Sequence, residues 1–314
     1  MGKLLMLILF TVIRAFSVNL AAQESESSGD PRVRFVGTWS LVSVERFDAD
    51  GVQLASPQGE EFGAGNPKGF IMYDSAGYMG VVIQQDRQQS ADDEALLGLR
   101  TYTSYFGPFS VNQDEGFVTH HVRGNLNPSG TGRDNRRYFE FSGNQLALKP
   151  PIGPTGIQLR IVWERMPPLS GLTPEQKRFV GFWAFDSMER FTLDGELVPT
   201  EKFEVGYLTY MPSGQMAVHL MRAGRQSYEN TVPTPEEARE AMDSYVSYFG
   251  PFTVHADDGY VLHHREGSSR PSGRGLDAQR FYDLDHSKLI LRPPVTTVDG
   301  REVQSLIHWR RLHE

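Results

Sequence analysis

The stretch Ser104-Tyr-Phe-Gly-Pro-Phe109 returns unchanged as Ser247-Tyr-Phe-Gly-Pro-Phe252, and these two copies decide how the chain is organised. A pair of adjacent histidines follows each copy, His120-His121 and His263-His264, at a constant offset of 263 − 120 = 143 residues. Six identical residues with further matches in register are not expected by chance. Solenoid repeats have periods of about 20–50 residues, so the longer period indicates two copies of a whole domain.

Each copy extends in both directions along the chain. The first opens with Gly37-Thr-Trp39 and the second with Gly181-Phe-Trp183. We therefore expect one domain at residues 35–166 and another at 179–314, joined by a stiff, Pro-rich linker at 167–178. A chain of 314 residues has the length of roughly two domains of about 150 residues each.

The composition excludes several classes of protein. Hydrophobic residues make up 39% of the chain, which is enough for a core in each domain. The formal charge of −8 argues against nucleic acid as a partner. The chain contains no cysteine, which excludes disulfides, thiolate metal sites and cysteine nucleophiles.

The N-terminal segment has the pattern of an export signal. Lys3 precedes an apolar run at residues 4–13, and Leu20-Ala-Ala22 supplies small residues before a polar stretch. We expect a signal peptide at residues 1–22, a disordered tether at 23–34 and a periplasmic or secreted protein without an integral membrane span after processing. The alternatives are a retained anchor or a misassigned start.

Apolar residues alternate with polar ones in many short segments of both repeats, which is the period of β-strands. Ile71, Met79 and Val81 keep their apolar character at their counterparts in the second repeat, so one face of each of these strands should be dry and the other wet. About eight short antiparallel strands per repeat predict an all-β fold of two tandem closed barrels.

Each repeat contains one convincing helix. Thr234-Pro-Glu-Glu237 is a capping box with proline at the first helical position. We expect helices near residues 234–247 and 92–104. Gly250-Pro251 and Gly107-Pro108 should end them.

The Gly-x-Trp openings and the closing segments Trp163-Glu-Arg165 and His308-Trp-Arg-Arg311 resemble the lipocalin signature. With the Tyr-Phe-Gly-Pro-Phe and His-His pattern, the chain is more narrowly similar to the bacterial and fungal lipocalin-like domain family. The resemblance covers nearly all of both repeats and implies barrels of the calycin type. By position it implies that two tryptophans plug the barrels, each covered by an arginine: Trp39 with Arg165 and Trp183 with Arg311. The chain lacks the lipocalin Thr-Asp-Tyr motif and the helix after the last strand, so the resemblance does not fix a ligand.

Two pairs of charged residues are candidates for the barrel lumen. Glu45 and Glu189 share the strand face of the Trp plugs at period 2, and Arg137 and Arg280 alternate with apolar residues. Each glutamate needs a partner if it is buried, and the arginines are the expected partners. The alternatives are a structural ion pair and an arginine that binds an acidic ligand group.

Only one histidine of each pair can face the lumen, because neighbours on a strand point to opposite faces. Charged Arg265 shares a face with His263, so we expect His121 and His264 to point inward. They are either structural or in contact with a ligand or reactant. One inward histidine and one glutamate are too few for a metal site, so we expect no metal and no cofactor.

Four tyrosines have the aromatic body and polar tip of residues at a pocket rim, although they are also compatible with a packed core: Tyr73, Tyr105, Tyr210 and Tyr248. Three functions follow from these features. We favour binding of a small hydrophobic or acidic ligand in the lumen. The alternatives are an enzyme of the isomerase, cyclase or hydrolase type that uses the lumenal Glu, Arg and His, and a protein-interaction module with filled barrels. No residue is assigned a catalytic role, and the oligomeric state is left open.

Overall fold

The computed structural model describes residues 29–55, 68–85, 93–200 and 202–312. The signal peptide predicted at residues 1–22 lies outside these residues, as does most of the tether predicted at 23–34. The described end of that tether forms a short 3-10 helix, η1 (Pro31–Arg34).

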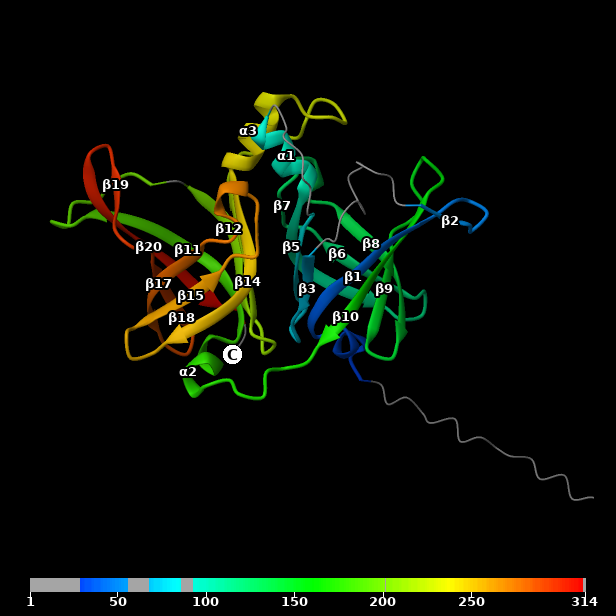
Figure 1. Cartoon of the computed structure of the whole chain (residues 1–314), viewed down its shortest axis with the longest axis horizontal. Helices are drawn as coiled ribbons and strands as arrows, with labels where there is room; N and C mark the ends of the chain where they lie inside the picture. The colour runs from blue at the N-terminus through cyan, green and yellow to red at the C-terminus, as the bar shows by residue number, and fades with distance from the viewer. Residues whose placement is uncertain (1–28, 56–67, 86–92, 201, 313–314) are drawn as a thin grey trace, which may run out of the picture. The chain divides into compact units, whose positions relative to one another are not determined.

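The first repeat is a closed antiparallel barrel (Figure 1). Its strands pair in the order β1-β3-β4-β5-β6-β8-β9-β10, and β10 pairs with β1 to close the circle, so eight strands of the described chain form the wall. Their bounds are β1 (Gly37–Phe47), β3 (Lys68–Tyr73), β4 (Tyr78–Gln84), β5 (Tyr102–Asn112), β6 (Phe117–His121), β8 (Asp134–Ser142), β9 (Gln145–Lys149) and β10 (Gln158–Met166). Short additions are β2 (Gln53–Leu54), β7 (Gly124–Asn125), α1 (Glu94–Thr101) and the 3-10 helix η2 (Pro128–Gly130).

The second repeat has the same circuit, closed by the pairing of β11 with β20. Its wall consists of β11 (Gly181–Thr192), β12 (Phe203–Tyr210), β13 (Gln215–Arg222), β14 (Tyr245–His255), β15 (Tyr260–His264), β17 (Asp277–Leu284), β18 (Lys288–Arg292) and β20 (Arg301–Arg311). Short additions are β16 (Gly267–Ser268), β19 (Thr296–Val298), α3 (Pro235–Asp243) and the 3-10 helix η3 (Pro271–Gly273). The predicted fold of two tandem barrels is confirmed.

The helices form where predicted but end earlier. The Thr234 side chain caps α3 through the predicted capping box, and α3 ends at Asp243. Gly107-Pro108 and Gly250-Pro251 do not end the helices, because they lie inside β5 and β14. A Cβ atom on Gly107 would lie 1.9 Å from the carbonyl oxygen of His121, so the glycine permits a close approach of two backbones.

The predicted linker contains an additional helix, α2 (Pro174–Phe179), which a capping box at Thr173 begins. Its last residue, Phe179, is buried, and its carbonyl accepts a hydrogen bond of 2.9 Å from the indole N–H of Trp183. The guanidinium of Arg311 lies 4.0 Å from the centre of the Trp183 ring. The first barrel repeats this arrangement, with Arg165 over Trp39 at 4.1 Å. Each tryptophan is thus fixed at its edge by a backbone carbonyl and on its face by an arginine.

A β-bulge changes which side chains of β1 point inward. Leu41 pairs with Trp163 but Ser43 pairs with the next residue, Val162, so Val42 is an extra residue in the ladder. Trp39, Leu41 and then Val44 belong to the core of the barrel. An extra residue inverts the alternation beyond it, and Glu45 therefore lies on the outer face.

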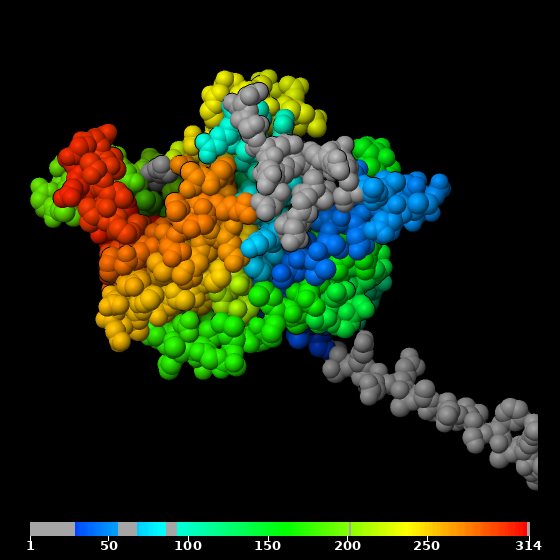
Figure 2. Space-filling model, in the orientation of Figure 1, coloured from blue at the N-terminus to red at the C-terminus, as the bar shows by residue number. Residues whose placement is uncertain are grey.

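The outer faces of several strands pack against the other barrel. Every residue of β3 after its first is buried, and β4, β12 and β13 are almost as fully covered. The prediction of one wet face on these strands is therefore wrong. A shared apolar cluster covers that face, and it includes Phe70, Met72, Phe106, Phe182, Tyr207 and Phe249. Helices α1 and α3 also lie side by side, in cyan and yellow in Figure 2.

Candidate functional site

The first barrel contains a cavity of about 1050 Å³. Such a volume lies at the upper end of the range for small-molecule sites, about 300–1,000 Å³. Much of the wall is apolar, with side chains from β3, β4, β9 and β10. These include Ile71, Val81, Ile83, Leu148, Ile161 and Trp163.

A hydrogen-bonded group of three aromatic side chains lies within this barrel. His120 on β6 is fully buried, and its Nε2 lies 2.8 Å from the hydroxyl of Tyr73. Its Nδ1 lies 3.1 Å from the hydroxyl of Tyr105. Both ring nitrogens are therefore occupied by tyrosine hydroxyls from β3 and β5.

The electrostatics keep this group neutral. Burial holds the pKa of His120 well below its usual value, and the positive charge of Arg137 acts in the same direction. Burial also raises the pKa of Tyr73 and of Tyr105, against the opposing effect of Arg137. A neutral imidazole has one donor and one acceptor nitrogen, so one tyrosine donates to His120 and the other accepts from it.

Arg137 on β8 places a positive charge beside this neutral group. It lies on the inner face with Phe139 and Phe141, as the alternation predicted, close enough to Tyr105 for its charge to oppose the burial-raised pKa of that tyrosine. One of its amino groups also donates to the carbonyl of Arg136 at 2.8 Å. Arg137 makes no ion pair with a carboxylate of the described chain, and no described Asp or Glu lines the cavity.

Two further polar groups in the cavity wall have no hydrogen-bond partner among the described residues. They are the indole N–H of Trp163 and the hydroxyl of Tyr228, both buried. Tyr228 belongs to the second repeat, where it lies in the loop between β13 and α3. Arg225 of the same loop contacts the first repeat, because its guanidinium donates a hydrogen bond of 2.6 Å to the carbonyl of Leu126. The second repeat thus completes part of the cavity wall of the first.

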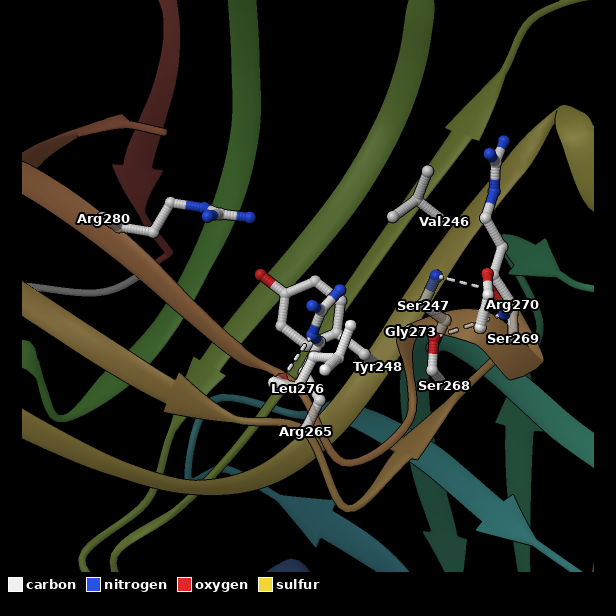
Figure 3. Close-up of a pocket in the computed structure, with 11 residues that line it drawn as sticks. Val246, Ser247, Tyr248, Arg265, Ser268, Ser269, Arg270, Gly273, Leu276 and Arg280 are labelled. Carbon is white, nitrogen blue, oxygen red and sulfur yellow. Dashed lines mark hydrogen bonds between the residues drawn. The ribbon is translucent and has the colours of Figure 1, made fainter. Parts of the chain in front are cut away.

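The second barrel repeats the neutral group. His263 is fully buried, with Nε2 at 2.7 Å from the Tyr210 hydroxyl and Nδ1 at 3.0 Å from the Tyr248 hydroxyl. Arg280 takes the place of Arg137. The cavity beside it is smaller, about 330 Å³; arginine and serine residues contribute much of its lining, but most of the surface that faces it is apolar (Figure 3).

The comparisons with known proteins agree with this architecture. The sequence profile of the lipocalin-like domain matches residues 36–166 and again residues 180–312. The chain belongs to the lipocalin-like domain family. No curated protein matches its sequence.

Similar solved structures lie far from this lipocalin-like protein in sequence. A protein of unknown function from Nostoc punctiforme is 9% identical, with a TM-score of 0.23, over 89% of this chain and 97% of that one. Transferrin binding protein B from Neisseria meningitidis is 9% identical, with a TM-score of 0.22, over 88% and 76%. The Haemophilus parasuis protein of the same name is 7% identical, with a TM-score of 0.20, over 88% and 61%. TM-scores this low establish no common fold.

The lipocalin-like barrels bring together only part of the predicted lumenal set. Tyr73, Tyr105 and Arg137 gather in the first barrel, and Tyr210, Tyr248 and Arg280 in the second. The pairing of each arginine with a lumenal glutamate is wrong. Glu45 instead accepts a hydrogen bond of 2.8 Å from Arg160 on the outer face. Glu189 lies beyond a matching bulge at Asp186, with its carboxylate 3.2 Å from Nε2 of His308.

The predicted facing of the histidines is also wrong. The side chain of His121 is 40% exposed and lies 2.8 Å from the carboxylate of Asp134. His264 makes the same contact with Asp277 at 2.9 Å. Arg265, whose charge suggested the reverse, does lie on the same side as His263, but it lines the cavity of the second barrel instead of facing water. The alternation of Val118 with His120 would have identified the inward histidine.

Two general searches of the described residues gave no site. No group of three or more Asp, Glu or His side chains in the described part of the chain could hold a metal ion. No helix within the described ranges is long and apolar enough to cross a membrane.

Proposed function

We propose that the first lipocalin-like barrel binds a small, partly hydrophobic molecule through an acidic group that contacts Arg137. The observation that carries this proposal is an arginine on the wall of a partly apolar cavity without a carboxylate partner among the described residues. A buried or half-buried charge needs a counter-charge. Guanidinium binds a carboxylate with two parallel hydrogen bonds, so a carboxylic acid supplies that counter-charge.

The uncharged group of two tyrosines and one histidine also favours an acidic ligand. Because Tyr73, His120 and Tyr105 carry no charge, they leave the positive charge of Arg137 uncompensated. The Arg136 carbonyl holds one amino group of Arg137 at 2.8 Å, and the charge of Arg137 acts on Tyr105, which is itself bonded to His120. An acid at Arg137 would therefore meet a positioned cation rather than a flexible one.

The rest of the cavity indicates the chemistry of the remainder of the ligand. Its apolar wall suits an aliphatic or aromatic body. The unpartnered N–H of Trp163 and hydroxyl of Tyr228 are buried in the wall and are not exposed to the cavity, so the apolar surface is what a ligand body would contact. A molecule with one acid group on an apolar body fits this cavity better than a plain hydrocarbon.

The alternatives receive less support from the same residues. A barrel filled by side chains does not have a cavity of about 1050 Å³. His120 is fully buried with both ring nitrogens bonded to tyrosines, so it has no free nitrogen to act as a general base. We also propose export, on the basis of the N-terminal segment alone; N-terminal sequencing of the mature protein should begin near Gln23.

Native mass spectrometry of the protein purified from its own host tests the binding function. We expect a bound small molecule that carries a carboxylate, and we expect the Arg137→Met variant to lose it. Recovery of the ligand-free mass alone, together with no binding of long-chain acids added in solution, would refute the proposal.

A further inference from the structure

The smaller cavity of the second barrel has as many arginines in its lining as the larger cavity of the first barrel, in about a third of the volume. Arg265, Arg270 and Arg280 all line it, and no described Asp or Glu does (Figure 3). Three serines from the segment after β15 line it as well: Ser268, Ser269 and Ser272. A cavity of about 330 Å³ lined in this way has a surplus of positive charge and of hydrogen-bond donors.

Two of the three guanidinium groups keep free donors. The Nε of Arg265 donates to the Leu276 carbonyl at 2.8 Å, and its guanidinium lies 5.8 Å from the centre of the Tyr248 ring. Its two terminal amino groups have no hydrogen-bond partner among the described residues. One amino group of Arg280 donates to the Gln279 carbonyl at 2.7 Å, and Arg280 makes no ion pair within the described chain. Arg270 is more peripheral, with Asp243 at 3.4 Å and 55% of its side chain exposed.

The serine hydroxyls add donors of the same kind. The Ser268 oxygen accepts from the backbone N–H of Arg270, and the Ser269 oxygen accepts from the backbone N–H of Ser247. Neither bond uses the hydroxyl hydrogen, which remains available to donate. Both serines are buried. A Cβ atom on Gly273 would lie 3.0 Å from the Ser268 hydroxyl oxygen and 3.2 Å from an amino group of Arg265, so this hydroxyl lies close to that arginine.

The first cavity is also lined by three arginines, Arg46, Arg100 and Arg137, but only one of them is at a position that corresponds to an arginine of the second cavity. At the repeat offset of 143 residues, Arg265 corresponds to Val122 and Arg270 to Asn127. Arg280 alone has a counterpart, Arg137. Two like charges on one small cavity repel each other, and an anion between them offsets the repulsion. The burial-lowered pKa of His263 is lowered further by Arg280 and by Arg265, so both charges act on the same part of the cavity.

We infer that the second barrel has its own ligand site, at Arg265, Arg280 and the adjoining serines, for a compact tetrahedral dianion of the phosphate or sulfate type. A monocarboxylate offers one charge to two guanidinium groups, whereas a dianion has enough oxygens for both arginines and the hydroxyls. The cavity volume lies near the lower limit of ligand sites, so the dianion is either a free ion or the head of a small monoester. This site is separate from the acid-binding cavity of the first barrel.

Titration calorimetry on the full chain, at constant ionic strength and in a buffer free of oxyanions, tests the inference. The probes are inorganic phosphate, inorganic sulfate and phenyl phosphate, with benzyl alcohol as the neutral probe. We expect the anions to bind and benzyl alcohol not to bind. Tighter binding of phenyl phosphate would identify a monoester as the natural ligand, and equal binding would identify the free ion.

The decisive variant is Arg265→Val, because valine is the residue at the corresponding position of the first barrel, Val122. It should weaken anion binding about tenfold or more, because a charge-assisted contact is lost. Arg301→Gln removes an exposed arginine of the same barrel outside the cavity and should change affinity less than about twofold. Arg265→Lys keeps the positive charge but lacks the planar guanidinium, so its affinity for the anion should lie between those of the wild type and of Arg265→Val. It replaces Arg265→Val if that variant does not fold.

Two results would overturn the inference. One is the absence of anion binding at millimolar concentration. The other is equal weakening by Arg265→Val and Arg301→Gln, which would mean unspecific attraction to surface charge. Binding of long-chain acids by the first barrel should be the same in all three variants, so failure at one site is distinguishable from failure at the other.

Discussion

The hydroxyl of Ser104 lies 2.9 Å from the hydroxyl of Ser247, its own counterpart in the other repeat. Around this contact the Tyr102 hydroxyl lies 3.0 Å from Ser247, and the Tyr245 hydroxyl lies 3.1 Å from Ser104. All four side chains are buried. The repeated Ser-Tyr-Phe-Gly-Pro-Phe motif thus has a double role. Its serine joins the two barrels, and its tyrosine reaches the buried histidine.

The paired serines should make a non-additive contribution to stability. Ser247→Ala leaves the buried Tyr102 hydroxyl without its partner, and Ser104→Ala removes a buried hydroxyl that contacts Ser247, Tyr245 and His219. Each should therefore lower the free energy of unfolding by about 1–3 kcal/mol. The double variant should cost less than the sum, because the two sites are in contact. Urea unfolding measures both, and the exposed Ser142→Ala serves as the control. Strictly additive losses would contradict the shared network.

Stability should fall on mild acidification because of three buried histidines of the described chain. Burial lowers the pKa of His120 and of His263 well below the usual value, and that of His219 to about 3. Below about pH 6.5 the unfolded chain binds protons at these histidines and the folded chain does not, so acid favours unfolding. Each histidine costs about 1.4 kcal/mol between about pH 7.5 and about pH 5.5.

His219→Val isolates one of these contributions, because Val82 occupies the equivalent position of the first repeat. The variant should lose about 1.4 kcal/mol less than wild type over that pH interval. Urea unfolding at the two pH values gives the difference. An identical loss in the two proteins would mean that His219 is protonated as readily in the folded protein as in the unfolded one.

The outward position of Glu45 predicts a small and uncoupled effect on the lumen. Its pair with Arg160 is partly exposed, so Glu45→Gln should change the free energy of unfolding by less than about 1 kcal/mol. Glu45→Gln and Arg137→Met should be additive within about 0.5 kcal/mol. A double-mutant cycle by urea unfolding measures this. A coupling energy of several kcal/mol between Glu45 and Arg137 would mean that Glu45 faces the lumen after all.

The sequence predicted the features that depend on repetition and local pattern. The two barrels, the capping box at Thr234 and the inward position of Arg137 all follow from periodicity or from short motifs. Each of these features depends on a few neighbouring residues or can be found by comparing the two repeats.

The errors arose where a single residue or a distant surface decides the outcome. The extra residue Val42 inverts the alternation of β1, and nothing in its neighbours marks the bulge. The charge of Arg265 indicated a position that faces water, but its side chain lines the cavity of the second barrel. The burial of Phe70 and Met72 depends on the other barrel, although their unbroken apolar run was a signal of burial on both faces. Tyr228 reaches the first cavity from a loop of the second repeat, which no local pattern predicts.

The central claim is that Arg137 binds an acid in the first barrel, and Arg136 provides a matched control. Arg136 is its neighbour on β8 but points outward, with its guanidinium 4.2 Å from the centre of the Phe117 ring. Titration calorimetry with dodecanoic acid and with dodecanol compares the two positions in the full chain. Dodecanol measures the apolar contribution to binding separately from the acid group.

We predict that Arg137→Met weakens dodecanoic acid binding about tenfold to a hundredfold, as expected for the loss of one charge-assisted contact of about 1.5–3 kcal/mol. Arg136→Met should leave the affinity within about twofold of wild type, and dodecanol should bind all three proteins equally. Equal affinity for dodecanoic acid in wild type and both variants, or equal losses in both variants, would contradict the account.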